Sequence, residues 1–423
     1  MRLSRIALFL VTASLLLAGG CQRDIIEIPE TPDKALIPTH RQGLPRVYIE
    51  TPKAIVSKLD WVELSTIRIE ADVNGRTVEV YKADSLKIKG RGNSTWFDYP
   101  KKPYSLKLKH KANLLGTGKT TRWALLANWM DRTKLRTPVA FEAARHTSME
   151  WAPSGIFVAL YLNKQYQGLY YLCERIHVEG SNFLADYLYS LDTSDSSEWD
   201  FYTLYGRWKG GAAEGEMPVE VKYPDRDKYE GNSFAGVISQ AESALHKVEK
   251  SIYEGGDWAK QIDLDSFCDW YLVHEVCGNV EPRHPKSCFF FLRDGKLYAG
   301  PVWDFDWNTF LPDQSNLLLR SSLWYHKLWE YKAFTRRLKE RWMVLKPGFE
   351  SLSTYIDAQA AFIREEESRD HEMWPCYPNP LSEDGSGYVN QDERMSFDDA
   401  VATLKTNLIQ RISYLDAQIR NLQ

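Results

Sequence analysis

Three carboxylates and a lysine flank a predicted β-hairpin in the second half of the chain. Glu281 and Lys286 precede this hairpin, whereas Asp304 and Asp306 follow it. The hairpin is predicted over residues 288–302, because two short apolar segments enclose an Asp-Gly turn dipeptide. A hairpin returns the chain to the place where it began. We therefore expect the acids before and after it to face the same bound group.

This order of side chains is suited to phosphoryl transfer. That reaction needs a carboxylate that positions the attacking hydroxyl and metal ions that bridge the phosphates. In protein kinases the first group is an Asp before a hairpin, and the second is an Asp just after it. On an extended strand Asp304 and Asp306 would point the same way, and their oxygen ligands favour Mg²⁺ or Mn²⁺. The alternative is that the two aspartates cap a strand end or hold a structural Ca²⁺.

Two further clusters contain groups that suit phosphate binding. In residues 89–96 the glycines let the backbone approach phosphate oxygens, and Arg91 and the nearby Lys102 supply positive charge. The cluster lacks the Walker and G-x-G-x-x-G patterns, so a solvated basic turn is the alternative. A predicted strand ends at Glu174 and Arg175. Glu174 would either pair with a phosphate-binding lysine or form an ordinary surface ion pair.

The elements that must position these residues are strands first and helices later. Short alternating segments predict strands through residues 46–108 and at 155–162 and 168–173. Helical patterns are predicted over residues 135–146, 233–253, 264–277 and 396–422. In the last helix apolar residues recur in steps of four and three, which favours a stripe that faces the core rather than a partner helix. The fold class is therefore α+β, with a sheet-rich N-terminal half and a helix-rich C-terminal half.

Composition excludes several classes of protein. The chain has 423 residues, 43% hydrophobic and 26% charged, which is typical of a globular protein. A net charge of -4 is too even for a protein that binds nucleic acid. Aromatic residues reach 13%, enough for a large core and for surfaces that stack on rings. Beyond Cys21 there are five cysteines without a C-x-x-C pair, so we expect buried free thiols rather than a zinc site or a disulfide framework.

The N-terminus has the pattern of an export signal. Two positive charges, a short apolar stretch and small residues precede Cys21. We predict a lipoprotein signal peptide over residues 1–20, with Cys21 as the lipidated residue; a plain signal peptide with a chance cysteine is the alternative. Residues 21–45 are rich in proline and predict an extended tether, and residues 46–423 predict the folded domain. The expected location is the bacterial cell envelope, where the N-terminal lipid would anchor the protein in a membrane. The protein would then lie at the outer membrane or the cell surface, with the periplasm as the alternative.

Several segments in order resemble the spore-coat protein H (CotH) kinase family. The matching segments are residues 88–96, 99–104, 123–128, 131–136, 161–163, 168–174, 279–281 and 300–306. The resemblance implies a divergent, atypical protein-kinase-like fold, with a β-rich lobe over about 46–175 and a helical lobe over about 176–423. It also implies ATP as the phosphoryl donor, Mg²⁺ or Mn²⁺ as cofactor, and Ser or Thr hydroxyls of an unidentified envelope or surface protein as acceptors.

The resemblance also implies roles for single residues. Asp304 matches the family's metal-binding Asp, and Asp306 would assist it, whereas Glu281 stands where the family has a catalytic Asp. Lys286 would act beside Glu281 at the phosphates. The nucleotide would be bound by the following residues: Arg91, Lys102, Glu174 and Tyr298, the last by stacking on adenine. The other reading is a catalytically silent lipoprotein of the same fold that binds a glycan or a protein, and the longer side chain of Glu281 favours it.

Overall fold

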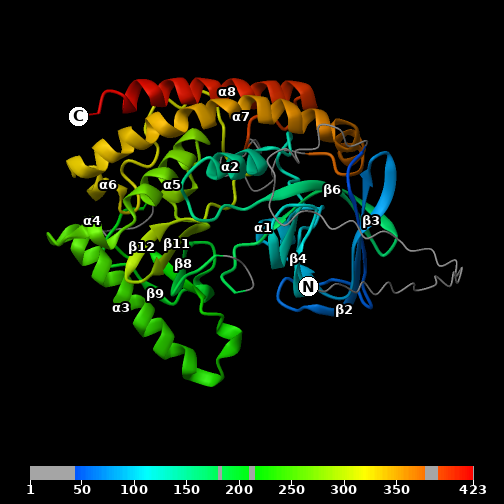
Figure 1. Ribbon diagram of the computed structural model, residues 1–423, viewed down its shortest axis with the longest axis horizontal. Helices are drawn as coiled ribbons and strands as arrows, with labels where there is room; N and C mark the ends of the chain where they lie inside the picture. The colour runs from blue at the N-terminus through cyan, green and yellow to red at the C-terminus, as the bar shows by residue number, and fades with distance from the viewer. Residues whose placement is uncertain (1–42, 180–182, 209–214, 377–388, 423) are drawn as a thin grey trace, which may run out of the picture.

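The computed structural model describes residues 43–179, 183–208, 215–376 and 389–422. The predicted signal peptide, the predicted lipidation site Cys21 and nearly all of the predicted tether lie outside these described residues. Two sheets and a set of helices make up the described chain (Figure 1). Among its helices, none combines the length and the apolar character that crossing a lipid bilayer requires.

Seven strands of the N-terminal half close into a barrel, in the order β1-β2-β3-β4-β5-β7-β6. Their bounds are β1 (Arg46–Glu50), β2 (Val62–Val73), β3 (Arg76–Gly90), β4 (Tyr104–Asn113), β5 (Lys119–Leu126), β6 (Gly155–Leu162) and β7 (Gln165–Glu174). Neighbouring strands are antiparallel except β1 and β6, whose parallel pairing closes the ring. The sheet-rich N-terminal half is confirmed, and its closure into a barrel is an addition to the prediction.

The barrel forms because its strands alternate apolar and polar side chains. Along β2, Ile67, Ile69 and Ala71 are buried, and the residues between them are partly exposed. Ile88 on β3 and Trp123 on β5 belong to the same buried cluster. Successive side chains of a strand point to opposite faces of the sheet, so each strand contributes one buried row. These rows fill the ring with a hydrophobic core.

A second sheet of five strands lies in the C-terminal half, in the order β12-β11-β8-β10-β9. Its strands are β8 (Tyr187–Leu191), β9 (Phe201–Tyr202), β10 (Pro218–Tyr223), β11 (Cys288–Arg293) and β12 (Lys296–Ala299). Strands β11 and β12 form the predicted hairpin, although β12 ends at Ala299 and not at Val302. The C-terminal half is therefore rich in helix, as predicted, but it is built around a sheet.

The four predicted helices are found to within a few residues, as α2, α3, α5 and α8, whereas the long helix α7 and the short helices α1, α4 and α6 had no predicted range. The bounds of the helices are α1 (Ser94–Phe97), α2 (Arg136–Arg145), α3 (Phe234–Tyr253), α4 (Trp258–Gln261), α5 (Leu264–Val276), α6 (Tyr325–Leu328), α7 (Lys332–Met373) and α8 (Phe397–Ile419). Short 3₁₀ turns are η2 (Ser196–Glu198), η3 (Arg226–Lys228), η4 (Gly231–Ser233) and η5 (Glu281–Arg283). Helix α8 begins where Ser396 Oγ accepts the N–H of Asp399 (3.1 Å). Its apolar stripe is buried, which confirms that it faces the core.

Helix α7 connects the two halves. It runs beside α8 along one face of the molecule and also contacts β7 of the barrel, α2 and α5 (Figure 1). Near its end, Asp370 Oδ1 accepts hydrogen bonds from Lys101 Nζ (2.7 Å) and from the N–H of Leu169 on β7 (2.8 Å). The side chains of Lys101 and Asp370 are completely buried. This ion pair therefore fixes the end of α7 against the barrel.

The cysteines of the described chain are all buried free thiols, namely Cys173, Cys268, Cys277, Cys288 and Cys376. Burial raises the pKa of the Cys173 thiol to about 12, so this thiol is protonated at neutral pH. Their burial agrees with the sequence analysis.

Candidate active site

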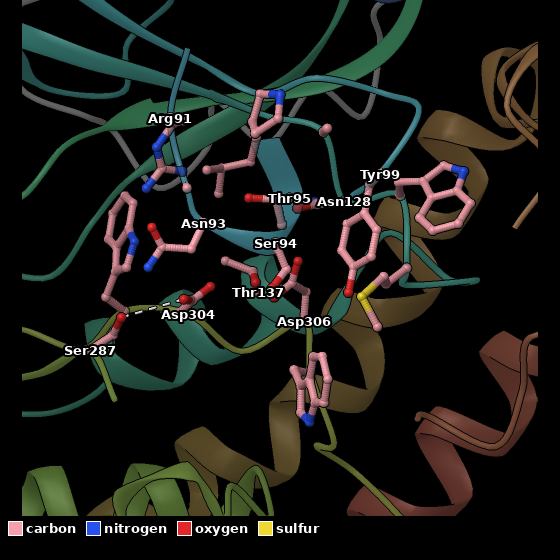
Figure 2. A pocket seen from close by; sticks show the side chains of 18 of the residues that line it. Arg91, Asn93, Ser94, Thr95, Tyr99, Asn128, Thr137, Ser287, Asp304 and Asp306 are labelled. Atoms are coloured by element: carbon pink, nitrogen blue, oxygen red, sulfur yellow. Dashed lines mark hydrogen bonds between the residues drawn. The ribbon is translucent and has the colours of Figure 1, made fainter. Parts of the chain in front are cut away.

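One cleft contains most of the residues predicted to do chemistry. Its volume is about 290 Å³, and it lies where the barrel meets the loops of the C-terminal half. Arg91, Glu281, Lys286, Asp304 and Asp306 all line it. Figure 2 shows the two aspartates facing the loop that contains Arg91. The acids before and after the hairpin therefore share one site, as the sequence predicted.

The end of helix α5 directs Glu281 into the cleft. The chain turns at Gly278, whose φ of +63° lies in the left-handed region that favours glycine at a helix C-terminus. The side chain of Asn279, which is itself buried, then accepts the N–H of Glu281 through Oδ1 (2.9 Å). This contact sets the start of the 3₁₀ turn η5 and so the position of Glu281.

The segment after the hairpin holds both aspartates, but it is not the extended strand that we expected. Asp304 has a φ of +65°, a left-handed conformation that Asp tolerates better than most residues. Phe305 is fully buried, and its N–H donates to Thr137 Oγ1 on α2 (3.4 Å). Asn390 Nδ2 donates to the carbonyl of Asp306 (2.8 Å). An irregular, anchored backbone, and not strand alternation, brings both carboxylates to the cleft.

Asp192 is a fourth carboxylate of the cleft, and the sequence analysis missed it. It follows β8 directly and accepts the N–H groups of Ser194 (2.8 Å) and Ser287 (3.0 Å). Ser287 Oγ in turn donates to Asp304 Oδ2 (3.4 Å), as Figure 2 shows. The available signal was an acid directly after the short, mostly apolar segment 187–191.

The carboxylates are crowded within the open cleft, where Glu281 and Asp306 are partly buried and Asp304 stays accessible to solvent. Burial raises the pKa of Glu281 well above its ordinary value, Asp304 adds to this effect, and Lys286 opposes it. Burial and then the charge of Asp304 raise the pKa of Asp306 to about 8. Burial also raises the pKa of Asp304, although Arg91 lowers it. Negative charge is therefore in excess here, which is the condition that a divalent cation relieves.

Asp304 and Asp306 are the residues that could hold Mg²⁺ or Mn²⁺. Both offer carboxylate oxygens, which these hard cations prefer, and Asp192 lies close enough for its charge to raise the pKa of Asp304. The cleft acids do not bring three ligand atoms within 4.8 Å of one another in the described chain. Mg²⁺ is commonly bound by one or two carboxylates together with substrate phosphates. The donor set therefore fits an ion that is completed by a nucleotide.

A different group in the described residues does bring three ligand atoms within 4.8 Å, namely His177, Glu179 and Asp225. Its carboxylates are already neutralised, because Lys228 pairs with Glu179 and Arg122 lies 3.5 Å from Asp225. Burial and the surrounding cations, Arg122 foremost, lower the pKa of His177 to about 3. A metal ion would have to compete with these bound cations, so we assign none to this group.

The lysines at 101 and 102 do not present free ammonium groups to the cleft. Lys102 was predicted to bind phosphate, but its Nζ donates to the carbonyls of Trp96 (2.7 Å) and Tyr99 (2.5 Å) and thereby holds the loop before it. Lys101 lines the cleft, yet its ammonium is engaged by Asp370. The other two cations that line the cleft, Arg91 and Lys286, form no ion pair with a described residue, and Arg91 lies over the ring of Trp303 (5.2 Å).

Two other predicted nucleotide-binding residues lie outside the cleft. Glu174 is buried against Gly118, with no ion pair to a described residue, and burial raises the pKa of its carboxyl to about 8. Tyr298 stacks on Phe291 (4.7 Å) and lies under Arg293 (5.0 Å), at a separate hollow of the hairpin. Neither side chain is therefore placed to contact a ligand in the cleft.

One end of the cleft is aromatic. Tyr99, Trp129, Met130 and Trp307 line it and pack together, with the rings of Tyr99 and Trp129 5.0 Å apart. Aromatic faces of this kind stack on flat rings. The sequence analysis noted the abundance of aromatic residues but did not locate this cluster, because its members come from segments that meet only in the fold.

Comparison with known protein families identifies a match. A family model described as CotH kinase protein matches residues 88–415, which is most of the chain. The matched range includes every cleft residue named above. No curated protein matches the chain.

Proposed function

This chain belongs to the CotH kinase family, and we propose that it is a metal-dependent protein kinase that transfers the γ-phosphoryl group of ATP to Ser or Thr hydroxyls. One observation supports this most strongly. Glu281 on one side of the hairpin and Asp304 and Asp306 on the other line a single open cleft. Phosphoryl transfer relies on positioning and electrostatic stabilisation, and this cleft supplies groups for both. The proposal includes a divergent kinase-like arrangement in which the N-terminal sheet is a closed barrel.

The cleft has a distinct place for each part of the nucleotide. At the aromatic end, the partly exposed ring of Trp307, which packs beside the buried Tyr99 and Trp129, suits the adenine ring, a role first expected of Tyr298. Arg91 and Lys286 suit the phosphates, because both are cations that line the cleft. Asp304 and Asp306 would hold Mg²⁺ or Mn²⁺. When bound, such an ion neutralises the charge that develops on the phosphoryl oxygens.

Glu281 is the group that would orient the acceptor hydroxyl. Its raised pKa, caused by burial and then by Asp304, makes its carboxylate a better proton acceptor than an exposed one. Its arm is one methylene longer than that of the Asp found in the family. This difference supports the second candidate, a catalytically silent module that binds a glycan or a protein.

A transfer assay separates the two candidates. The chain from Gln22 onward is incubated with labelled ATP, with Mg²⁺ or Mn²⁺, and with dephosphorylated casein. We expect label in the protein or in casein, a loss of about a hundredfold or more in Glu281→Gln, and no transfer by Asp304→Asn. Asp313→Asn is the matched control, because Asp313 also has a left-handed φ (+57°) but is exposed and does not line the cleft.

Two results would reject the kinase hypothesis. One is the absence of label with either metal, together with no rise of the melting temperature on adding ATP and metal. The other is equal transfer by the wild type and Asp304→Asn. The first result would leave the silent binding module as the better description.

A further inference from the structure

Four cations lie side by side across four neighbouring strands of the barrel. In the strand register, Lys87 on β3 faces Lys107 on β4, and Lys107 faces Arg122 on β5. The next position belongs to Arg175, which follows β7 directly and donates its N–H to the carbonyl of Arg122 (3.0 Å). We call these four residues the cation row.

The cation row is on the outer surface of the barrel. The neighbours of its members along the strands, namely Ile88, Leu106 and Trp123, are fully buried inside the ring. Successive side chains alternate between the two faces of a sheet, so the row faces outward. With ~4.8 Å between neighbouring strands, the row extends over about 14 Å.

Protein carboxylates neutralise this row only in part. Lys87 pairs with Glu63, and Arg122 lies 3.5 Å from Asp225. Lys107 and Arg175 form no ion pair with any described residue. Like charges that face each other on adjacent strands destabilise a sheet. The row is therefore a feature that does not serve the fold, and its charge is complementary to an anionic ligand.

The cation row continues into the cleft. Arg91 lies one residue beyond the end of β3 and lines the cleft, where it also lacks an ion pair with a described residue. Burial lowers the pKa of Arg175 to about 10, and the nearby charges of Arg91 and Arg122 add to this effect. Arg175 therefore bridges the outer surface of the barrel and the proposed phosphate site.

We propose that the cation row docks an acidic segment of the protein acceptor while the adjoining Ser or Thr lies in the cleft. This inference rests on the proposed function for its choice of ligand. At ~3.3 Å per residue an extended chain would pass four or five residues along the row. Lys107, Arg122 and Arg175 do not line the cleft, so they are not needed for the nucleotide. The acceptor is thus a polypeptide with several Asp or Glu residues beside the modified hydroxyl.

Binding without nucleotide tests this proposal. The probe is a fluorescein-labelled peptide that has one serine with five glutamates on one side of it. The control peptide has five glutamines in place of the glutamates. Binding of each peptide to the protein is measured by fluorescence anisotropy at low salt. We expect the acidic peptide to bind and the glutamine peptide not to bind. The affinity of the acidic peptide should fall as the salt concentration rises. The double variant Lys107→Glu/Arg175→Gln should bind about tenfold more weakly, since each ion pair at these partly exposed positions is worth about 1 kcal/mol and ~1.4 kcal/mol is tenfold.

Two controls keep the result specific. Lys247→Glu makes the same charge reversal as Lys107→Glu, but on the exposed face of α3, away from the barrel in Figure 1, and should leave binding unchanged. Lys107→Gln should weaken binding and also raise the melting temperature of the free protein, because it removes like-charge repulsion on both sides. The higher melting temperature excludes loss of folding as the cause.

The outcomes also separate this proposal from the kinase activity. If the acidic peptide binds through the row but no phosphate is transferred, docking holds and the kinase fails. If phosphate is transferred with equal KM for the two peptides, the kinase holds and docking is wrong. Binding of phosphatidylglycerol vesicles through Lys107, with no binding of the peptide, would also overturn docking and would assign the row to lipid head groups.

Discussion

Glu281 differs from the Asp of the CotH kinase family by one methylene. It starts η5 two residues after Asn279, whose side chain accepts its N–H, so its backbone is fixed by the end of α5 and only its side chain can adjust. A positioning error of about 1 Å in a reacting group can cost on the order of a hundredfold in rate. If the proposed function holds, the length of this one side chain decides whether phosphate is transferred fast, slowly or not at all.

We expect Glu281→Asp to raise turnover by up to about a hundredfold, because it restores the shorter side chain that the family resemblance implies at this position. The KM for ATP should stay the same, since Glu281 is assigned to the acceptor hydroxyl. The measurement is kcat for transfer to casein, with Glu281→Asp/Asp304→Asn as the inactive control. A lower kcat than that of the wild type would mean that this cleft is fitted to glutamate.

Glu174 makes the stability of the protein depend on pH. Burial raises the pKa of its carboxyl to about 8, against 4.5 for an ordinary Glu. The folded state therefore keeps the proton between these values while the unfolded chain releases it, so the free energy of unfolding falls as pH rises from about 4.5 to about 8. The effect amounts to a few kcal/mol at ~1.4 kcal/mol per pKa unit.

Glu174→Gln should remove this dependence. We expect the variant to match the wild type near pH 5 and to be more stable than the wild type at pH 8.5. Urea unfolding of both proteins at the two pH values measures the difference. An equal loss of stability in wild type and variant would show that the dependence comes from other groups.

At the scale of elements, α7 is the helix that fixes the barrel to the rest of the molecule. Its buried contact is the ion pair of Asp370 with Lys101, and Lys134 Nζ lies 3.8 Å from the other carboxylate oxygen. The Asp370 side chain also accepts the N–H of Leu169 on β7. One carboxylate therefore neutralises a buried cation and accepts a backbone N–H of the barrel. The long helix therefore sets the position of the barrel, and with it the Arg91 side of the cleft.

We expect Asp370→Asn to lower the free energy of unfolding by about 3–5 kcal/mol, because it leaves Lys101 as an uncompensated buried charge. Asp357→Asn is the matched control on the same helix. Its partner is Lys405, both side chains are well exposed, and the loss should be within about 1 kcal/mol. Urea unfolding measures both. Equal effects would show that burial does not govern the contribution of this pair.

At the scale of the whole molecule, the barrel and the second sheet lie next to each other and the paired helices α7 and α8 run along both (Figure 1). The described chain begins at Gly43 and leads directly into β1 of the barrel. We propose that the preceding residues hold this whole body in the bacterial cell envelope through a lipid on Cys21. The cleft would then act on proteins of the envelope or the cell surface.

Cys21→Ser tests this anchor. When the whole chain including its signal peptide is expressed, the wild type should sediment with membranes and should enter the detergent phase. The reason is that two or more acyl chains hold a protein firmly at a membrane. The variant should appear in the soluble fraction with unchanged melting temperature. Continued sedimentation of the variant would contradict lipidation at this residue.

The sequence by itself determined most strands of the barrel, four of the helices and the pairing of the acids across the hairpin, but not α7 or strands β8 to β10. Alternating segments predicted the strands, and steps of three and four predicted α8, because these periods are set by local backbone geometry. The Asp-Gly turn made β11 and β12 adjacent, so Glu281 and Asp304 had to lie near each other. The family resemblance drew on the same local segments.

Only the tertiary structure decided which side chains share the cleft. Lys102 is tied to the carbonyls of its own loop, Tyr298 faces the outer side of the hairpin, and Asp192 enters from β8. The closure of the barrel likewise depends on β1 and β6, which are distant in the chain. Local patterns fix the direction of a side chain relative to its own element. Its partners are set by how distant elements pack, and that depends on the whole set of buried contacts at once.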